Sequence, residues 1–189
     1  MTGQEANPRR LAELIEKGGS LEGFPWPERT TVFDIRIGRD GTWYYQESAI
    51  HRLRLCQLFS TVLQRDEMGD YWLVTPGERG RITVDDAPFL AVEVKTDEEN
   101  GQQVLKFRTN LDHWVTADVD HPIRVETDPK TAEPSPYIRF RGRLDALIAR
   151  PVYYELVDMA EEKTIDGRTV FTVTSAGEQF VLGSMPADA

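Results

Sequence analysis

Arginines beside predicted strands and helix starts are the residues of this chain best suited to binding chemistry. A guanidinium group holds a phosphate or a carboxylate through paired hydrogen bonds. The arginines that we select as ligand-binding candidates are Arg36, Arg52, Arg139 and Arg150. Arg52 and Arg150 both stand at predicted helix starts, where free backbone N–H groups also attract anions. The pattern predicts an anion-binding site, and the structural alternative is a set of salt bridges to carboxylates such as Asp34 and Asp145.

Aromatic residues interleave with these arginines. Trp43 and Tyr45 fall in a predicted hairpin, and Tyr153 falls in a predicted helix. A nucleotide base can stack on such rings while guanidinium groups hold its phosphate. We therefore expect Trp43, Tyr45 and Tyr153 to supply the walls of a site for a small nucleotide-like ligand, and the alternative is that these rings belong to the core.

Other reactive groups show no established catalytic spacing. His113, Asp118 and His121 are acceptable ligands for a divalent metal, but they lack the compact spacing of known metal motifs. The serines lack a glycine-flanked nucleophile elbow, and no phosphate-binding glycine loop occurs. Cys56 follows Leu55 in a predicted helix, where cysteine behaves as a small apolar residue. The sequence thus predicts no metal site, no cofactor and no catalytic residue.

Composition limits the partners of the chain. Its 189 residues carry a formal net charge of -10, which disfavours nucleic-acid polymers and anionic membrane surfaces. A hydrophobic content of 40% supports a packed core, and one cysteine excludes an internal disulfide. No run approaches the roughly 20 apolar residues of a membrane span. With no hydrophobic signal region at the polar N-terminus, we expect a cytoplasmic protein.

The elements that would position the candidate residues begin with a helix over residues 7–18 and a linker over 21–29. A hairpin follows at 32–37 and 42–46, because apolar and polar residues alternate around Asp40-Gly41. Ser48 is the expected N-cap of a helix over 50–64, and a strand is expected at 71–75. The remaining predicted strands are 81–84, 90–94, 104–109, 123–126, 137–141, 170–174 and 179–182, with a helix over 151–162. The acidic run 97–101 is expected to be a hairpin loop.

Part of the first half is echoed in the second. Residues 33–37 resemble residues 136–140, with Arg36 matched to Arg139. Ile50 then matches Ile148 at a shift of 148 − 50 = 98, and the same shift relates Gly69 to Gly167. A duplicated unit commonly packs against its twin, and the seam is a common ligand site.

We therefore predict an α+β fold with mostly antiparallel sheet and two related subdomains from an internal duplication. The expected divisions are an N-terminal helix and linker over residues 1–30, an N-terminal α+β domain over 31–77, and a β-rich C-terminal domain with one helix over 78–189.

Several motifs resemble the bacterial domain-of-unknown-function (DUF) 1285 family, in the same order and spacing over residues 20–183. They are FDIRI at 33–37, DGTWY at 40–44, YWLVTP at 71–76, DDAPF at 85–89 and LDALIARP at 144–151. The chain departs from the family at Ser48-Ala49-Ile50, where members typically show Ser-Pro-Ile. The resemblance implies an α+β fold with an internal duplication and a C-terminal part similar to pleckstrin homology-like folds. It also implies a nucleotide-based ligand between the domains and a role in signal transduction, with no established enzymatic activity.

Three functional hypotheses follow. The first is a non-enzymatic sensor or regulator that binds a small anionic, nucleotide-like ligand at the interface of the two domains. The second is a protein-interaction module that docks a protein partner through a strand edge or an acidic face. The third, which ranks last, is a metal-dependent enzyme built around His113, Asp118 and His121.

Overall fold

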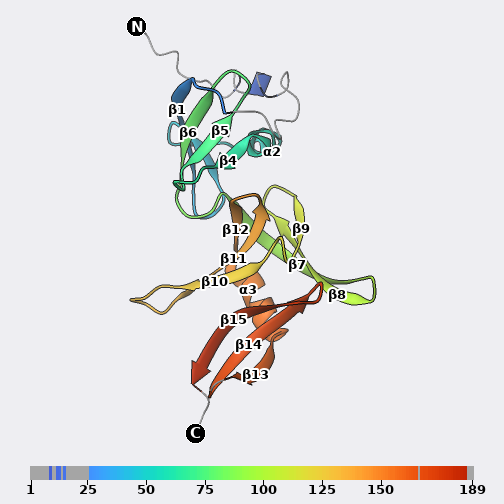
Figure 1. Cartoon of the computed structure of the whole chain (residues 1–189). Coiled ribbons are helices and arrows are strands. Elements are labelled where there is room, and N and C mark those ends of the chain that lie inside the picture. The colour runs from blue at the N-terminus through green and yellow to red at the C-terminus, as the bar shows by residue number, and fades with distance from the viewer. Residues whose placement is uncertain (1–8, 10–11, 14, 16–25, 166, 187–189) are drawn as a thin grey trace. The chain divides into compact units, whose positions relative to one another are not determined.

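The computed structural model describes residues 9, 12–13, 15, 26–165 and 167–186, and the chain divides into two compact units, Met1–Pro88 and Phe89–Ala189 (Figure 1). The helix predicted over residues 7–18 lies mostly outside the described residues. Both units are mostly sheet, and in the described residues each contains one full helix of nine residues.

The N-terminal unit is built on a six-stranded sheet in the order β3-β2-β1-β6-β5-β4. Its strands are β1 (Thr30–Ile37), β2 (Trp43–Tyr45), β3 (Ser48–Ala49), β4 (Leu63–Arg65), β5 (Tyr71–Val74) and β6 (Arg79–Val84). The predicted hairpin is confirmed, since β1 pairs antiparallel with β2. Alternation buries Phe33, Ile35 and Ile37 of β1 in the core.

Long-range pairing extends this unit beyond the boundary expected at residue 77. Strand β6 pairs in parallel with β1 and antiparallel with β5, so it completes the N-terminal sheet. The division therefore falls between Pro88 and Phe89.

The C-terminal unit contains a six-stranded sheet in the order β10-β11-β12-β7-β8-β9 and a three-stranded sheet in the order β13-β14-β15. The strands of the first are β7 (Phe89–Glu99), β8 (Gln102–Thr109), β9 (Trp114–Thr116), β10 (Ile123–Thr127), β11 (Pro134–Arg141) and β12 (Leu144–Ile148). The second holds β13 (Glu161–Ile165), β14 (Arg168–Ser175) and β15 (Glu178–Pro186). Pairing is antiparallel except between β12 and β7, which confirms the mostly antiparallel character within the described residues.

Both helices are shorter than the sequence predicted. Helix α2 spans Leu53–Thr61 and α3 spans Arg150–Asp158. Ser48 does not cap α2, because it pairs with Tyr45 in β3 and the N-cap position belongs to Arg52. Strands occupy the residues where the sequence predicted the last turn of each helix, since β4 begins at Leu63 and β13 begins at Glu161.

The acidic run at residues 97–101 is not a loop as predicted. Strand β7 continues through Glu99, and the turn itself is Asn100-Gly101, where both φ angles are positive. Lys106 on the paired strand β8 lies 2.7 Å from both Asp97 and Glu99. This cross-strand cation compensates the acidic charges and lets them remain in a strand.

The two units repeat one order of elements: a three-stranded meander, a helix and a second three-stranded meander. In the N-terminal unit these are β1-β2-β3, α2 and β4-β5-β6, and in the C-terminal unit β10-β11-β12, α3 and β13-β14-β15. Strand β10 is therefore the counterpart of β1. The sequence match of residues 33–37 to residues 136–140 in β11 is displaced by one strand.

Register identifies the residues that correspond. The shift of 98 relates Ala49 to Leu147, because 147 − 49 = 98. Ala49 pairs with Tyr44, which pairs with Arg36. Leu147 pairs with Tyr137, which pairs with Arg124. Arg36 thus corresponds to Arg124 and not to Arg139.

Candidate functional site

Arg36 is held by neighbours within the N-terminal unit. Its Nη1 donates to Asp85 Oδ2 at 2.6 Å, and its guanidinium carbon lies 4.3 Å from the ring centroid of Tyr44. These contacts match the structural alternative of an ion pair, reinforced by a cation–π contact.

The structure brings Arg36 and Tyr45 together around a shallow cavity of about 290 Å³ on β1 and β2. Asp34 and Glu47 line the same cavity. Two carboxylates beside one arginine disfavour an anion there.

Trp43 and Arg52 have opposite surroundings. Trp43 is 1% exposed, and its ring centroid lies 6.1 Å from that of Phe59, so the indole belongs to the core. Its Nε1 has no hydrogen-bond partner among the described residues. Arg52 is exposed at the N-cap of α2 and forms no ion pair within the described part of the chain.

In the C-terminal unit, Arg139 joins a cluster around a buried carboxylate. Arg139 Nε donates to Asp145 Oδ1 at 2.6 Å, and its Nη1 donates to the Gly142 carbonyl at 3.0 Å. Arg124 Nη2 lies 3.2 Å from Asp145 Oδ2. The Asp145 side chain is 6% exposed, so one buried carboxylate neutralises part of the charge of both arginines.

The two remaining candidates lie on α3. Arg150 is exposed, and its Nε donates to the Tyr154 hydroxyl at 2.7 Å. Tyr153 donates from its hydroxyl to the Leu182 carbonyl at 3.0 Å, and burial raises the pKa of this phenol. Tyr153 therefore ties α3 to β15.

A basic hairpin joins β11 to β12 in the same unit. Arg139 and Arg141 lie at the end of β11, and Arg143 lies in the turn beside Gly142, whose φ is 51°. Arg141 lies with its guanidinium carbon 5.8 Å from the ring centroid of Phe140. The Phe140 ring centroid is 5.8 Å from that of His113 and 4.5 Å from that of Phe89, which is buried in the core. Arginines and rings thus meet at one end of the C-terminal unit.

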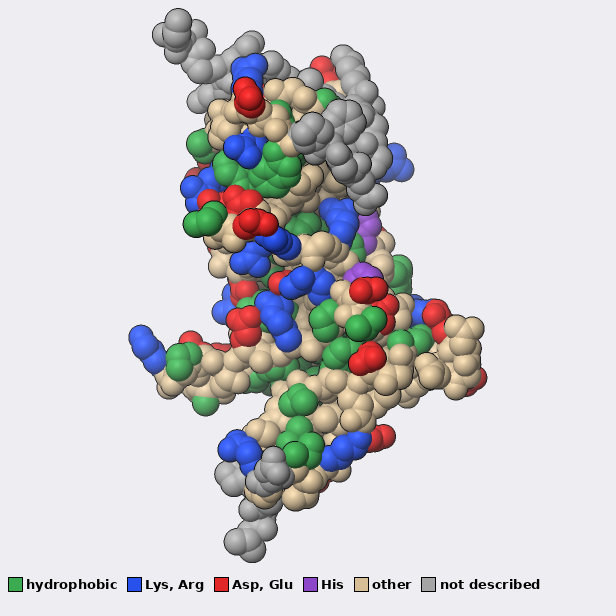
Figure 2. Space-filling view, in the orientation of Figure 1, with side chains coloured by type: hydrophobic (Ala, Val, Ile, Leu, Met, Phe, Trp, Pro, Cys, Tyr) green, Lys and Arg blue, Asp and Glu red, His purple; other side chains and the backbone are tan. Residues whose placement is uncertain are grey.

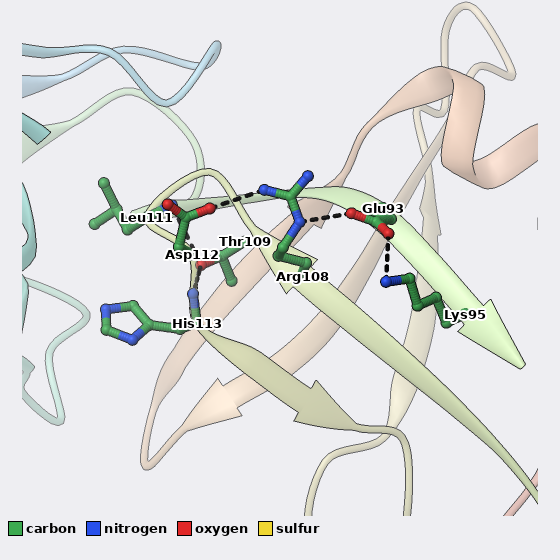
Figure 3. A network of polar contacts seen from close by, with 7 residues as sticks. All are labelled: Glu93, Lys95, Arg108, Thr109, Leu111, Asp112 and His113. Atoms are coloured by element: carbon green, nitrogen blue, oxygen red, sulfur yellow. Dashed lines mark hydrogen bonds and ion pairs between the residues drawn. The ribbon is translucent and has the colours of Figure 1, made fainter. Parts of the chain in front are cut away.

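His113 is oriented by the turn between β8 and β9. Thr109 N–H donates to the His113 carbonyl at 2.8 Å, and the backbone N–H of His113 lies 3.2 Å from Thr109 Oγ1. The imidazole points away from the nearby ion pairs (Figure 3). Burial, and then the positive charge of Arg141, lower the pKa of His113, which favours the neutral form of the imidazole.

The ion pairs in Figure 3 form a chain across β7 and β8. Glu93 accepts from Lys95 at 3.1 Å and from Arg108 at 2.6 Å, and Arg108 Nη1 continues to Asp112 at 2.8 Å. The hydrogen bond from Arg108, followed by that from Lys95, lowers the pKa of Glu93. Charges of both signs are likewise interspersed over the visible face in Figure 2. Each charged group in this series of ion pairs faces a partner of opposite charge, so the series offers no unpaired group for catalysis.

The metal hypothesis fails on geometry. His121 Nδ1 lies 2.9 Å from Asp118 Oδ1, but the His113 ring packs near Phe140 instead. No group of three or more metal-ligating side chains forms anywhere in the described residues.

No helix of the described chain combines the length and apolar character needed to cross a membrane.

Sequence reasoning missed Arg124 and Tyr137, which repeat the pair Arg36 and Tyr44. The Arg124 guanidinium carbon lies 4.5 Å from the Tyr137 ring centroid. A signal existed, because Ile123-Arg124-Val125 matches Ile35-Arg36-Ile37 as well as residues 138–140 do. Similarity alone could not choose between the two matches.

Comparisons with known proteins agree with the two units. Residues 25–87 match the model "Domain of unknown function (DUF1285), N-terminal domain", and residues 88–182 match "Protein of unknown function (DUF1285), C-terminal domain". None of the curated proteins compared with the chain matches it.

Two solved structures are similar. A DUF1285 family protein from Silicibacter pomeroyi DSS-3 is 38% identical, with a TM-score of 0.82 and 95% of each chain covered. A DUF1285 family protein from Shewanella baltica OS155 shares 23% identity and a TM-score of 0.53, covering 67% of this chain and 92% of its own, and this likeness concerns the fold alone. Because the family models match most of its length, the chain belongs to the DUF1285 family.

Proposed function

We propose that this protein is a non-enzymatic sensor or regulator that binds a small anionic, nucleotide-like ligand through the β11–β12 hairpin of its C-terminal unit. A role in signal transduction is part of the proposal, with the ligand as the signal. The single observation that carries it is the concentration of three arginines within five residues, Arg139 to Arg143, in a chain of net charge -10.

The surroundings of the hairpin favour a nucleotide over a simple anion. Arg139 is fixed by Asp145, which pre-orients it, while Arg143 is exposed at the turn. Phe140 and His113 place two rings beside Arg141, and a base can stack where aromatic and guanidinium groups alternate. A neutral His113 can also exchange hydrogen bonds with a base without adding charge.

The test is a titration of the purified protein with adenosine and guanosine mono- and triphosphates and with inorganic phosphate, followed by calorimetry and melting temperature. A ligand at 100 times its dissociation constant stabilises a fold by about 2.7 kcal/mol, which raises the melting temperature by roughly 5–11 °C for a chain of this size. We expect the double variant Arg141→Gln/Arg143→Gln to weaken nucleotide binding by about tenfold or more, a loss of about 1.4 kcal/mol.

The matched control is Arg54→Gln/Lys130→Gln, which removes two exposed positive charges elsewhere. Equal affinity in the folded hairpin variant and the wild type would overturn the proposal, as would the absence of binding by every nucleotide tested. Arg52→Ala and Arg150→Ala, measured in the same way, test whether those two arginines bind the ligand.

Three finer expectations remain predictions. They are the position of the ligand between the two domains, the pleckstrin homology-like form of the C-terminal part, and the cytoplasmic location. The alternative function, a protein-interaction module, receives support from a separate feature of the C-terminal unit.

A further inference from the structure

Strands β10 and β15 of the C-terminal unit border a groove with a volume of about 580 Å³. Its lining comes from β10, from β15 and from Arg168 at the start of β14: Ile123, Arg124, Val125, Thr127, Arg168, Val181, Leu182, Gly183 and Ser184. The two strands lie close and diverge towards the β10–β11 turn (Figure 1).

The groove occupies the place where the N-terminal unit pairs two strands. There β1 and β6, the counterparts of β10 and β15, form a parallel ladder from Thr30 and Arg79 to Ile37 and Val84. Within the described residues, β10 and β15 are the edges of two separate sheets with no ladder between them. The corresponding strand edges are thus paired with each other in the N-terminal unit and left without a ladder between them in the C-terminal unit.

The backbone of β10 offers hydrogen bonds to the groove. Arg139 N–H donates to the Pro122 carbonyl at 3.1 Å, which sets the alternation of this antiparallel pair. By that alternation Arg124 bonds to β11, while Ile123, Val125 and Thr127 turn their backbone groups the other way. These three residues line the groove. An exposed strand edge of this kind is a template for another strand.

On the β15 side of the groove, one backbone carbonyl is already hydrogen-bonded and one apolar side chain is exposed. The Leu182 carbonyl on β15 accepts a hydrogen bond from Tyr153 of α3, so the helix satisfies the edge at this point. Val181 is 53% exposed beside it. A strand docked along β10 would cover this apolar side chain.

The charge of the residues that line the groove indicates what kind of ligand it favours. Two arginines and no carboxylate line the groove, in a chain of net charge -10. Arg124 is partly neutralised by Asp145 and Glu126. Arg168 donates to Ser184 Oγ at 3.2 Å and forms no ion pair within the described chain, so its charge is available to a ligand.

We propose that this groove binds an extended peptide segment with acidic side chains, which adds to the β10 edge by backbone pairing and places a carboxylate on Arg168. The backbone groups of β10 provide affinity, and the arginines provide selectivity for acidic residues. This site is distinct from the β11–β12 hairpin, so it stands or falls independently of the proposed nucleotide function.

The experiment uses the full chain and a displayed library of ten-residue peptides with Asp or Glu fixed at alternate positions. A second library with Lys or Arg at those positions is the control. We expect enrichment from the acidic library only. The strongest peptide, made synthetically, should bind the wild type, and its affinity for the Arg168→Glu variant should be lower by about tenfold or more. Its affinity for the control variant Arg54→Glu should equal its affinity for the wild type.

Two further arms separate edge pairing from charge alone. Val125→Pro removes a groove-facing N–H at a position that does not bond to β11, so the fold should survive and peptide binding should fall. Amide exchange of Ile123, Val125 and Thr127 should slow when the peptide is bound. Failure of the acidic library to enrich, equal binding by the basic library, or unchanged affinity in folded Arg168→Glu or Val125→Pro would each overturn the proposal. Nucleotide titration of the same variants should leave nucleotide affinity unchanged.

Discussion

Arg139 donates from Nε to Asp145 Oδ1 at 2.6 Å, and this ion pair joins neighbouring strands β11 and β12 around a carboxylate that is 6% exposed. Arg124 reaches the same carboxylate from β10. One buried acid therefore fixes the register of a three-stranded meander and orients the arginines that flank both proposed sites.

Asp145→Asn should destabilise the C-terminal unit by about 1–3 kcal/mol, because both arginines lose their ionic partner while the side-chain shape is kept. Urea unfolding followed by circular dichroism measures the change. Glu126→Gln, which removes only the exposed partner of Arg124, should cost about 0–1 kcal/mol. Equal effects of the two substitutions would show that the buried carboxylate has no special role.

Gly80→Ala should destabilise the N-terminal unit by about 1–3 kcal/mol, the usual cost of overpacking a core. A Cβ at this position would lie 2.0 Å from Cδ2 of Phe33, whose side chain is 2% exposed and has no room to move. Gly77→Ala is the control, since a Cβ there meets nothing within 4 Å. Tryptophan fluorescence during urea unfolding reports the difference, because Trp26, Trp43 and Trp72 lie in this unit. A Gly80→Ala variant as stable as Gly77→Ala would contradict the packing of Phe33.

Stability should fall as the pH decreases through about 6.5, the ordinary pKa of histidine. The pKa of His113 in the folded chain is lowered by burial and by Arg141, against an opposing effect of Asp112. His113 therefore binds a proton more readily in the unfolded chain than in the folded chain. Its contribution to stability is fully present above the pKa of the unfolded state and is lost as the pH falls below that value. His113→Gln should flatten this loss between pH 7.5 and about 5.5, whereas His51→Gln at an exposed position should not. NMR titration of the imidazole gives the pKa directly, and a value at or above the ordinary one would reject this account.

Cys56 should be unreactive in the folded chain. Burial raises the pKa of its thiol to about 11, and the side chain is 4% exposed. About one thiol in a thousand would then be thiolate at pH 8. A chromogenic disulfide reagent should react slowly in buffer and rapidly in concentrated urea, and immediate reaction of the folded protein would show that α2 does not bury this residue.

Local sequence was enough to predict the first hairpin and the presence of both helices. Apolar and polar residues alternate along β1, and Asp40 accepts from Thr42 N–H at 3.0 Å to shape the turn that Asp-Gly predicts. In α3 the buried residues Val152 and Leu156 are four apart, as one helical face requires. The same local motifs were enough to predict the family.

Tertiary structure decided the features that depend on partners distant in the sequence. Residues 79–84 have strand character in the sequence, but only the sheet shows that they pair in parallel with β1 and belong to the first unit. The helices ended early because β4 and β13 found strand partners. Trp43 could stack on a ligand or enter the core, and packing against Phe59 chose the core. Arg36 has two equally good sequence matches in the second half of the chain, Arg124 and Arg139. Hydrogen-bond register identifies Arg124 as the equivalent residue. Sequence could not decide this, because side-chain similarity carries no information about which strands are neighbours.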